Sequence, residues 1–263
     1  MIERLVRWGA TFVERILRRL TEMQFIDRGL VVGAQAFSAL VPLLIVLASL
    51  TPTTKTNSFA EDVVHRFGLS GAGAQAVRNA FSGTTTGTTL SIVSVLIVLF
   101  SALSFARRLQ RIYELSWDLP RLGVRGGTIH CIRWLLLFSF WIAIHPLVPG
   151  VFHGNGGLTI SVAFAFALWL ATPYILLAGR IAWHSLLLQA GLTAVGMVAL
   201  EIGSSFYVPR QISKSAQEYG AIGVAFTLLS VLWAAGFVVV ISAALGSLRH
   251  AEEHKATQAL DED

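Results

Sequence analysis

Residues Leu90–Ala106 form an uncharged run, LSIVSVLIVLFSALSFA, that constrains this chain more than any other stretch. Such a run suits a helix that crosses a bilayer, because the helix satisfies its own backbone and its side chains are soluble among acyl chains. A basic segment follows at once, and basic residues are retained at the cytoplasmic face. We therefore expect its arginines to contact anionic lipids of the cytoplasmic leaflet: Arg107, Arg108, Arg111, Arg121 and Arg125.

The composition supports the same class of protein. Only 13% of the 263 residues are charged and 54% are hydrophobic, whereas an ordinary soluble domain carries about 25% charged residues. The net charge of +5 is explained by basic residues held at the cytoplasmic face, so no nucleic-acid partner is predicted. A single cysteine, Cys131, excludes an internal disulfide, and we expect it to pack rather than act as a thiolate with His130.

We predict an all-α fold, a polytopic transmembrane helical bundle of about six spans. The stretch Trp134–Gly179 lacks Asp, Glu, Lys and Arg over 46 positions, enough for two spans joined by a turn at Pro149–Gly157. Tyr207–Glu218 is expected to be a polar outer loop. The spans are placed near residues 29–52, 88–106, 128–148, 158–178, 183–205 and 219–247, within a membrane domain of residues 29–248.

Three further segments flank or interrupt the spans. Residues 1–28 alternate apolar and basic positions at helical spacing, which predicts a cytoplasmic amphipathic surface helix. Its role is either a membrane anchor or lipid sensing. Residues 55–87 are read as an outer amphipathic segment that ends in a flexible Gly/Thr-rich linker, and residues 249–263 as a charged, frayed cytoplasmic tail.

The distribution of basic residues predicts the orientation. With both termini on one side, 15 of the 20 Lys and Arg residues lie on that side. The other five are Lys55, Arg66, Arg78, Arg210 and Lys214. The bias places the N- and C-termini in the cytoplasm, as expected for a multi-pass membrane protein.

Three segments resemble a known family. They are DRGLVVGAQAFSALVPLLIVLASL from Asp27, SALSFARRLQRIYELSWDLPR, and YGAIGVAFTLLSVLWAAGFVVVISAALGS from Tyr219. Together they resemble the YihY/BrkB-type envelope membrane family, once labelled ribonuclease BN. The resemblance implies an inner-membrane helical protein with about six spans, associated with envelope integrity. The family usually has an acidic residue after the Leu-Gly of the last span; here Ser247 follows Gly246, so a role for that carboxylate does not carry over.

The sequence argues against an enzyme. A nuclease would need carboxylates or histidines that bind metal in a polar site, and no H-E-x-x-H, G-x-S-x-G or Walker motif is present. His250 and His254 flank two glutamates in the tail, a spacing that occurs without any ligand. We therefore predict no catalytic residue, no metal and no cofactor.

Polar residues inside the spans are the candidates for a substrate cavity. They are Gln35, Ser38 and Glu201, together with Pro42, because a proline within a span frees a backbone carbonyl. A charged group at the bilayer centre costs about 2.5–3.5 kcal/mol on insertion scales, so its retention suggests use. Two alternatives remain open: Glu201 reaches water or pairs with Arg210 at the outer interface, and Gln35 forms an interhelical hydrogen bond.

These features favour a secondary transporter or flippase-like protein for a lipid-like or amphipathic substrate. The segments SALVPLLIVLA around Pro42 and WLATPYILLAG around Pro173 are similar, and inverted repeats with proline-broken helices are typical of transporters. The alternative is a non-transporting scaffold that recruits envelope-synthesis partners. Membrane lipids are the expected partners, and homo-oligomerisation is left open.

Overall fold

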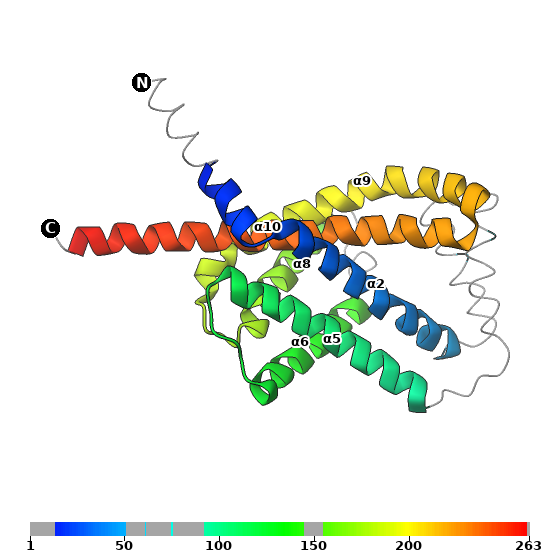
Figure 1. The fold of residues 1–263 in the computed structure, drawn as a ribbon, viewed down its shortest axis with the longest axis horizontal. Helices are drawn as coiled ribbons and strands as arrows, with labels where there is room; N and C mark the ends of the chain where they lie inside the picture. Colours follow the sequence, from blue (N-terminus) through cyan, green and yellow to red (C-terminus); the bar gives the residue numbers. More distant parts are fainter. Residues whose placement is uncertain (1–13, 51–60, 62–74, 76–91, 145–154, 262–263) are drawn as a thin grey trace, which may run out of the picture. The chain divides into compact units, whose positions relative to one another are not determined.

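The structure is a computed structural model, and it describes residues 14–50, 61, 75, 92–144 and 155–261 (Figure 1). Over these residues it contains helices and no strands, which confirms the all-α class. Residues 14–22 are helical. The helices that follow are α2 (Phe25–Leu50), α5 (Ile92–Ser116), α6 (Val124–Ile144), α8 (Asn155–Leu176), the 3₁₀ helix η2 (Trp183–Leu186), α9 (Leu187–Tyr219) and α10 (Ala221–Asp261).

Two of the described helical segments are long and apolar enough to cross a membrane, Trp183–Tyr219 and Ile222–His250. At 1.5 Å per residue, each exceeds the hydrocarbon core of about 30 Å. A shorter apolar helical stretch, Val162–Leu176, lies within α8. Large apolar side chains are exposed along α6 and α9: Ile129, Ile132, Leu136, Phe140, Val195, Val198, Ile202 and Phe206.

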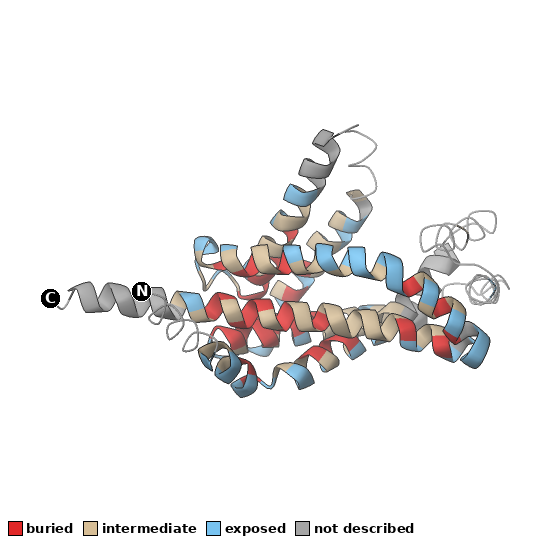
Figure 2. Ribbon diagram, turned by 90° about the horizontal axis from the view of Figure 1, so that it is seen from above, coloured by how far each residue is buried: buried red, intermediate tan, exposed pale blue. Residues whose placement is uncertain are grey.

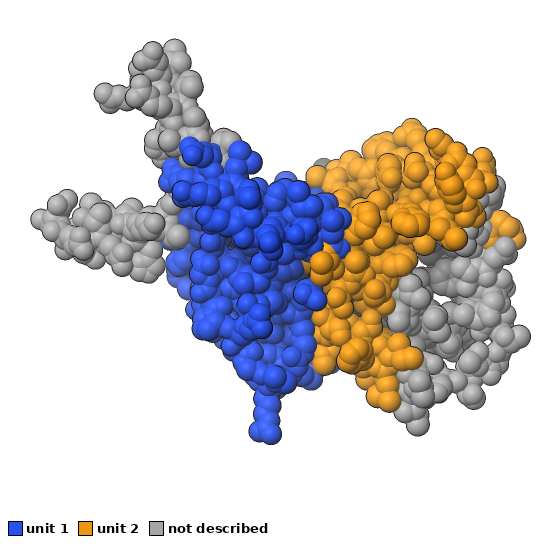
Figure 3. All heavy atoms as spheres, viewed as in Figure 1, with its two compact units in different colours: residues 1–30, 106–197, 236–263 blue, residues 31–105, 198–235 orange. Residues whose placement is uncertain are grey.

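The chain divides into two compact units (Figure 3). Unit 1 comprises residues 1–30, 106–197 and 236–263, and unit 2 comprises residues 31–105 and 198–235. The cavity described below belongs to unit 1. The predicted substrate-cavity residues belong to unit 2.

Unit 1 has a core in which apolar and small residues alternate along α10. Val240, Ala243 and Ala244 are fully or almost fully buried there, at the i, i+3 and i+4 spacing of one helix face. Figure 2 shows this concentration of buried residues in the unit 1 part of α10. Small residues bring α9 and α10 together, since a Cβ added at Gly246 would lie 2.7 Å from the Cβ of Gln189.

The segments that follow α5 and α8 in unit 1 begin with defined helix ends. After α5, Asp118 adopts a positive φ of 49°, and the Leu119 amide donates to the Glu114 carbonyl at 2.8 Å. After α8, Ala178 has a φ of 59°, and the Gly179 amide donates to the Tyr174 carbonyl at 2.9 Å. Both ends satisfy carbonyls that a helix terminus would otherwise leave without a partner.

Unit 2 is held by close contacts between helix backbones. A Cβ added at Gly33 of α2 would lie 2.6 Å from Cδ1 of Trp233 and 2.7 Å from the carbonyl of Leu232 in α10. Gly223 of α10 packs as closely against the backbone of Ser215 in α9. Glycine lets helices approach this closely, which is how membrane helices pack without a hydrophobic driving force between them.

Several element bounds differ from the sequence predictions. The expected outer loop 207–218 is helical, because α9 continues to Tyr219 with Pro209 inside it. The tail is also helical, since α10 extends to Asp261. Residues 155–157, expected in a turn, open α8. Residues 1–13, 145–154 and most of the outer segment 55–87 lie outside the described residues.

Candidate functional site

Glu114 is the centre of a polar cluster at the end of α5. Its carboxylate is buried, with 4% of the side chain exposed, and it pairs with Arg180 at 3.1 Å and Arg111 at 3.4 Å. It also accepts a hydrogen bond from the Leu122 amide at 2.9 Å. Arg180 in turn donates to the Pro120 carbonyl at 2.7 Å. One carboxylate therefore fixes the α5–α6 loop to the turn that follows α8.

A second contact ties the N-terminal helix to the same loop. Arg19 donates to the Ser116 carbonyl at 2.9 Å and pairs with Asp118 at 2.7 Å. Arg28 lies near this region, and burial together with the positive charge of Arg111 lowers its pKa. Within unit 1, the described residues of the segment predicted as an amphipathic surface helix thus pack against the end of α5 and the loop that follows it.

Two of the five arginines predicted to contact anionic lipids bond to other residues of unit 1. Arg107 donates to the Thr128 hydroxyl and to the Val124 carbonyl, so it ties α5 to the first turn of α6. Arg111 is half-buried beside Glu114. The other three are exposed and remain available to lipid: Arg108, Arg121 and Arg125.

A buried amide network lies beneath the charged cluster. Gln110 donates to the Leu176 carbonyl at 2.7 Å, and the Cys131 thiol is 3.5 Å from the Gln110 amide oxygen. The Trp117 indole donates to Gln189 at 2.8 Å. Burial raises the pKa of the Tyr113 hydroxyl, which lies in this network and stays neutral. Cys131 is fully buried, in agreement with the packing role predicted for it.

The predicted substrate-cavity residues of unit 2 are placed as follows. Glu201 is exposed on α9, and its carboxylate has no hydrogen bond or ion pair with any described residue. Arg210, its suggested partner, donates to the Phe206 carbonyl at 3.4 Å. Gln35 is half-buried on α2 and its amide likewise has no described hydrogen-bond partner. No Glu201–Arg210 pair and no interhelical hydrogen bond of Gln35 occurs among the described side chains, whereas contact of the exposed Glu201 with water stays an open alternative.

The other two predicted substrate-cavity residues, Ser38 and Pro42, both lie on α2. The Ser38 hydroxyl donates to the Ala34 carbonyl of its own helix at 3.0 Å, and the Ser38 carbonyl accepts from Ser101 at 3.2 Å. The second bond joins α2 to α5. Pro42 lies within α2, but its side chain is outside the described set.

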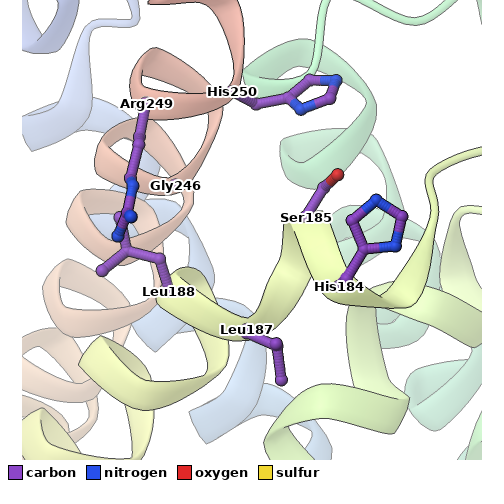
Figure 4. A pocket seen from close by; sticks show the side chains of 7 residues that line it. All are labelled: His184, Ser185, Leu187, Leu188, Gly246, Arg249 and His250. Atoms are coloured by element: carbon purple, nitrogen blue, oxygen red, sulfur yellow. The ribbon is translucent and has the colours of Figure 1, made fainter. Parts of the chain in front are cut away.

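A cavity of about 350 Å³ opens in unit 1 between the start of α9 and the distal part of α10 (Figure 4). Two of its lining residues are leucines, and most of the others are basic or polar. The lining residues are His184, Ser185, Leu187, Leu188, Gly246, Arg249 and His250. The His250 ring packs 5.4 Å from the ring of Trp117. No group of three or more potential metal ligands occurs among the residues that the structure describes.

Sequence reasoning missed the cluster around Glu114 and the cavity. Glu114 lies among three arginines of α5, at i−3, i−6 and i−7, and an acidic residue in such a basic segment could have indicated an ion pair. The cavity joins residues 184–188 to residues 246–250, and neither segment carries a recognisable motif. Comparison of the chain with protein-family models, curated proteins and solved structures finds no match.

Proposed function

We propose that this chain is a multi-pass inner-membrane protein that accommodates and moves a lipid-like or amphipathic envelope substrate. The observation that carries the proposal is the unpaired carboxylate of Glu201 among the described residues. Its carboxylate belongs to a helix long and apolar enough to span a membrane, yet it has no partner among the described residues. The side-chain amide of Gln35 on α2 likewise has no hydrogen-bond partner among the described residues.

Glu201 differs from the buried carboxylate Glu114 in its partners and in its surroundings. The polar groups around Glu114 are paired, as buried polar groups should be. Glu201 instead lies between exposed apolar side chains, Val198 at 40% and Ile202 at 57% exposure. A carboxylate on such a face costs about 2.5–3.5 kcal/mol in the bilayer, which a polar substrate headgroup or a proton would offset.

The proposal includes the finer topology. Six spans with both termini in the cytoplasm agree with the distribution of basic residues and with the resemblance to the YihY/BrkB-type family. The sequence has no Walker motif, which favours secondary transport or a flippase-like role over an ATP-driven pump.

A non-transporting scaffold is the second candidate, and the length of α10 favours it. This helix has 41 residues, about 60 Å, so it extends well beyond a hydrocarbon core of about 30 Å. Its distal part is rich in charged residues and could present a docking surface to envelope-synthesis partners. A scaffold of this kind would not need Glu201 or Gln35.

Lipid mass spectrometry on the detergent-purified protein separates the two candidates. We expect a lipid or envelope precursor to be enriched with the wild type and lost from the double variant Glu201→Gln plus Gln35→Ala. Ser205→Ala is the matched control, because the Ser205 hydroxyl bonds only to the Ile202 carbonyl of its own helix at 2.7 Å. Bulk phospholipid alone, unchanged in the double variant, would favour the scaffold.

A further inference from the structure

The cavity of unit 1 has the lining of an oxyanion site. Arg249 carries a permanent positive charge, His184 and His250 can donate from ring nitrogens, and Ser185 adds a hydroxyl. None of its seven lining residues is acidic. A guanidinium matches the oxygens of a phosphate with two parallel donors, so this donor set suits a phosphate group better than a cation or a neutral sugar.

The backbone places the side chains that line the cavity. His184 and Ser185 lie in η2, and α9 begins directly after it at Leu187. The Leu187 amide donates to the His184 carbonyl, so the side chains, and not the first amide of α9, supply the donors of the cavity. Figure 4 shows η2 and the start of α9 on one side of the cavity and α10 on the other.

The walls of the cavity are held in place by the core of unit 1. Gly246 allows α10 to approach Gln189 closely, with only 2.7 Å available to an added Cβ. Gln189 accepts from the Trp117 indole at 2.8 Å, and the Trp117 ring packs against His250. A site formed before its ligand arrives loses less entropy on binding.

The surroundings indicate where the phosphate comes from. Trp183, next to the cavity, is 59% exposed, and Leu187 in its lining is 38% exposed. Exposed tryptophan is enriched at the level of lipid headgroups. The apolar face of α9 continues away from the cavity with Val195, at 70% exposure, where acyl chains could lie.

We propose that this cavity binds the phosphate of an anionic membrane lipid, with Arg249 as its principal ligand and the two histidines and Ser185 as further donors. The inference rests on the proposed membrane function, which it deepens by naming the chemistry of the headgroup. Basic pockets between membrane helices bind anionic headgroups in this way.

The test measures binding of three probes to the full chain purified in a neutral detergent. The probes are dioctanoyl phosphatidylglycerol, dioctanoyl phosphatidylcholine and inorganic phosphate. We expect phosphatidylglycerol to bind more tightly than phosphatidylcholine, and Arg249→Gln to weaken it about tenfold, the loss expected for one charge-assisted contact. Arg249→Lys should restore part of the affinity because it keeps the charge.

Arg121→Gln is the matched control, because Arg121 is exposed and does not line the cavity. An equal loss of phosphatidylglycerol binding in Arg121→Gln and Arg249→Gln would overturn the proposal in favour of general surface attraction. Unchanged binding in Arg249→Gln would also overturn it. Inorganic phosphate could bind as tightly as phosphatidylglycerol, with this binding lost in Arg249→Gln. That result would support a phosphate site whose ligand is free phosphate and not a lipid headgroup.

The proposed phosphate site in the cavity and the proposed transport function can be overturned independently of each other. Suppose that phosphatidylglycerol binding is unchanged in Arg249→Gln, while lipid enrichment is lost in the Glu201 and Gln35 double variant. This result would overturn the proposed phosphate site and leave the transport proposal intact. The opposite pattern would leave an anionic-lipid site on a protein that does not use its intramembrane polar residues. Each variant is compared only if its gel-filtration profile matches that of the wild type.

Discussion

Replacing Glu114 with alanine is expected to destabilise unit 1 by about 3–5 kcal/mol, the cost of leaving one member of a buried ion pair without its partner. Two arginines lose their carboxylate, Arg180 at 3.1 Å and Arg111 at 3.4 Å. The Leu122 amide loses its acceptor as well. Because Glu114 is almost fully buried, water cannot replace these interactions without opening the cluster.

Cys131 provides the readout for this prediction. It is the single cysteine of the chain and is fully buried in unit 1, so a thiol-reactive fluorescent maleimide reports unfolding on heating. Asp118→Ala is the matched control, since the Asp118 side chain is 76% exposed and its pair with Arg19 contributes about 0–1 kcal/mol. Equal shifts in the two variants would contradict the central role of Glu114.

Replacing Gly33 with alanine is expected to cost about 1–3 kcal/mol or more, the range for inserting a group into a filled site. The new Cβ would lie 2.6 Å from Trp233 and 2.7 Å from the backbone of Leu232. The Trp233 ring can rotate, but the Leu232 carbonyl belongs to a helix and cannot move alone. The contact between α2 and α10 must therefore widen, and the packing of unit 2 loosens.

Gly203→Ala separates this clash from the general effect of removing a glycine. An added Cβ at Gly203 meets no atom within 4 Å, so the substitution should stabilise α9 by up to about 1 kcal/mol through helix propensity. Gel-filtration thermostability of the two detergent-purified variants measures the difference. A Gly33→Ala variant as stable as Gly203→Ala would contradict the close approach of α2 and α10.

Uncharged runs were enough to predict the helical class and several helix positions. Pro173 lies inside α8 as expected, and α6 covers most of the predicted third span. The sequence misplaced the polar segment 207–218, because Pro209 and its charges suggested a loop. The structure keeps it helical while Val208 and Ile212, at i and i+4, are buried in unit 2. Tertiary packing overrides local preference there.

The candidate sites show a similar limit. Composition alone drew attention to Gln35 and Glu201, which lie in apolar surroundings and have no described partner. It assigned all five arginines after Leu90–Ala106 to lipid, although Arg107 and Arg111 bond within the protein. Only the folded chain distinguishes these roles, because the partner of Arg111, Glu114, also pairs with Arg180 from a distant segment.

Transbilayer movement of a lipid tests the proposed transport most directly. The purified full chain is reconstituted into vesicles that contain a fluorescent phosphatidylglycerol, and dithionite quenches the label in the outer leaflet. We expect wild-type protein to expose inner-leaflet label to quenching and the double variant Glu201→Gln plus Gln35→Ala not to do so. Quenching limited to the outer leaflet with the wild type, or equal in both proteins, would contradict the proposed transport.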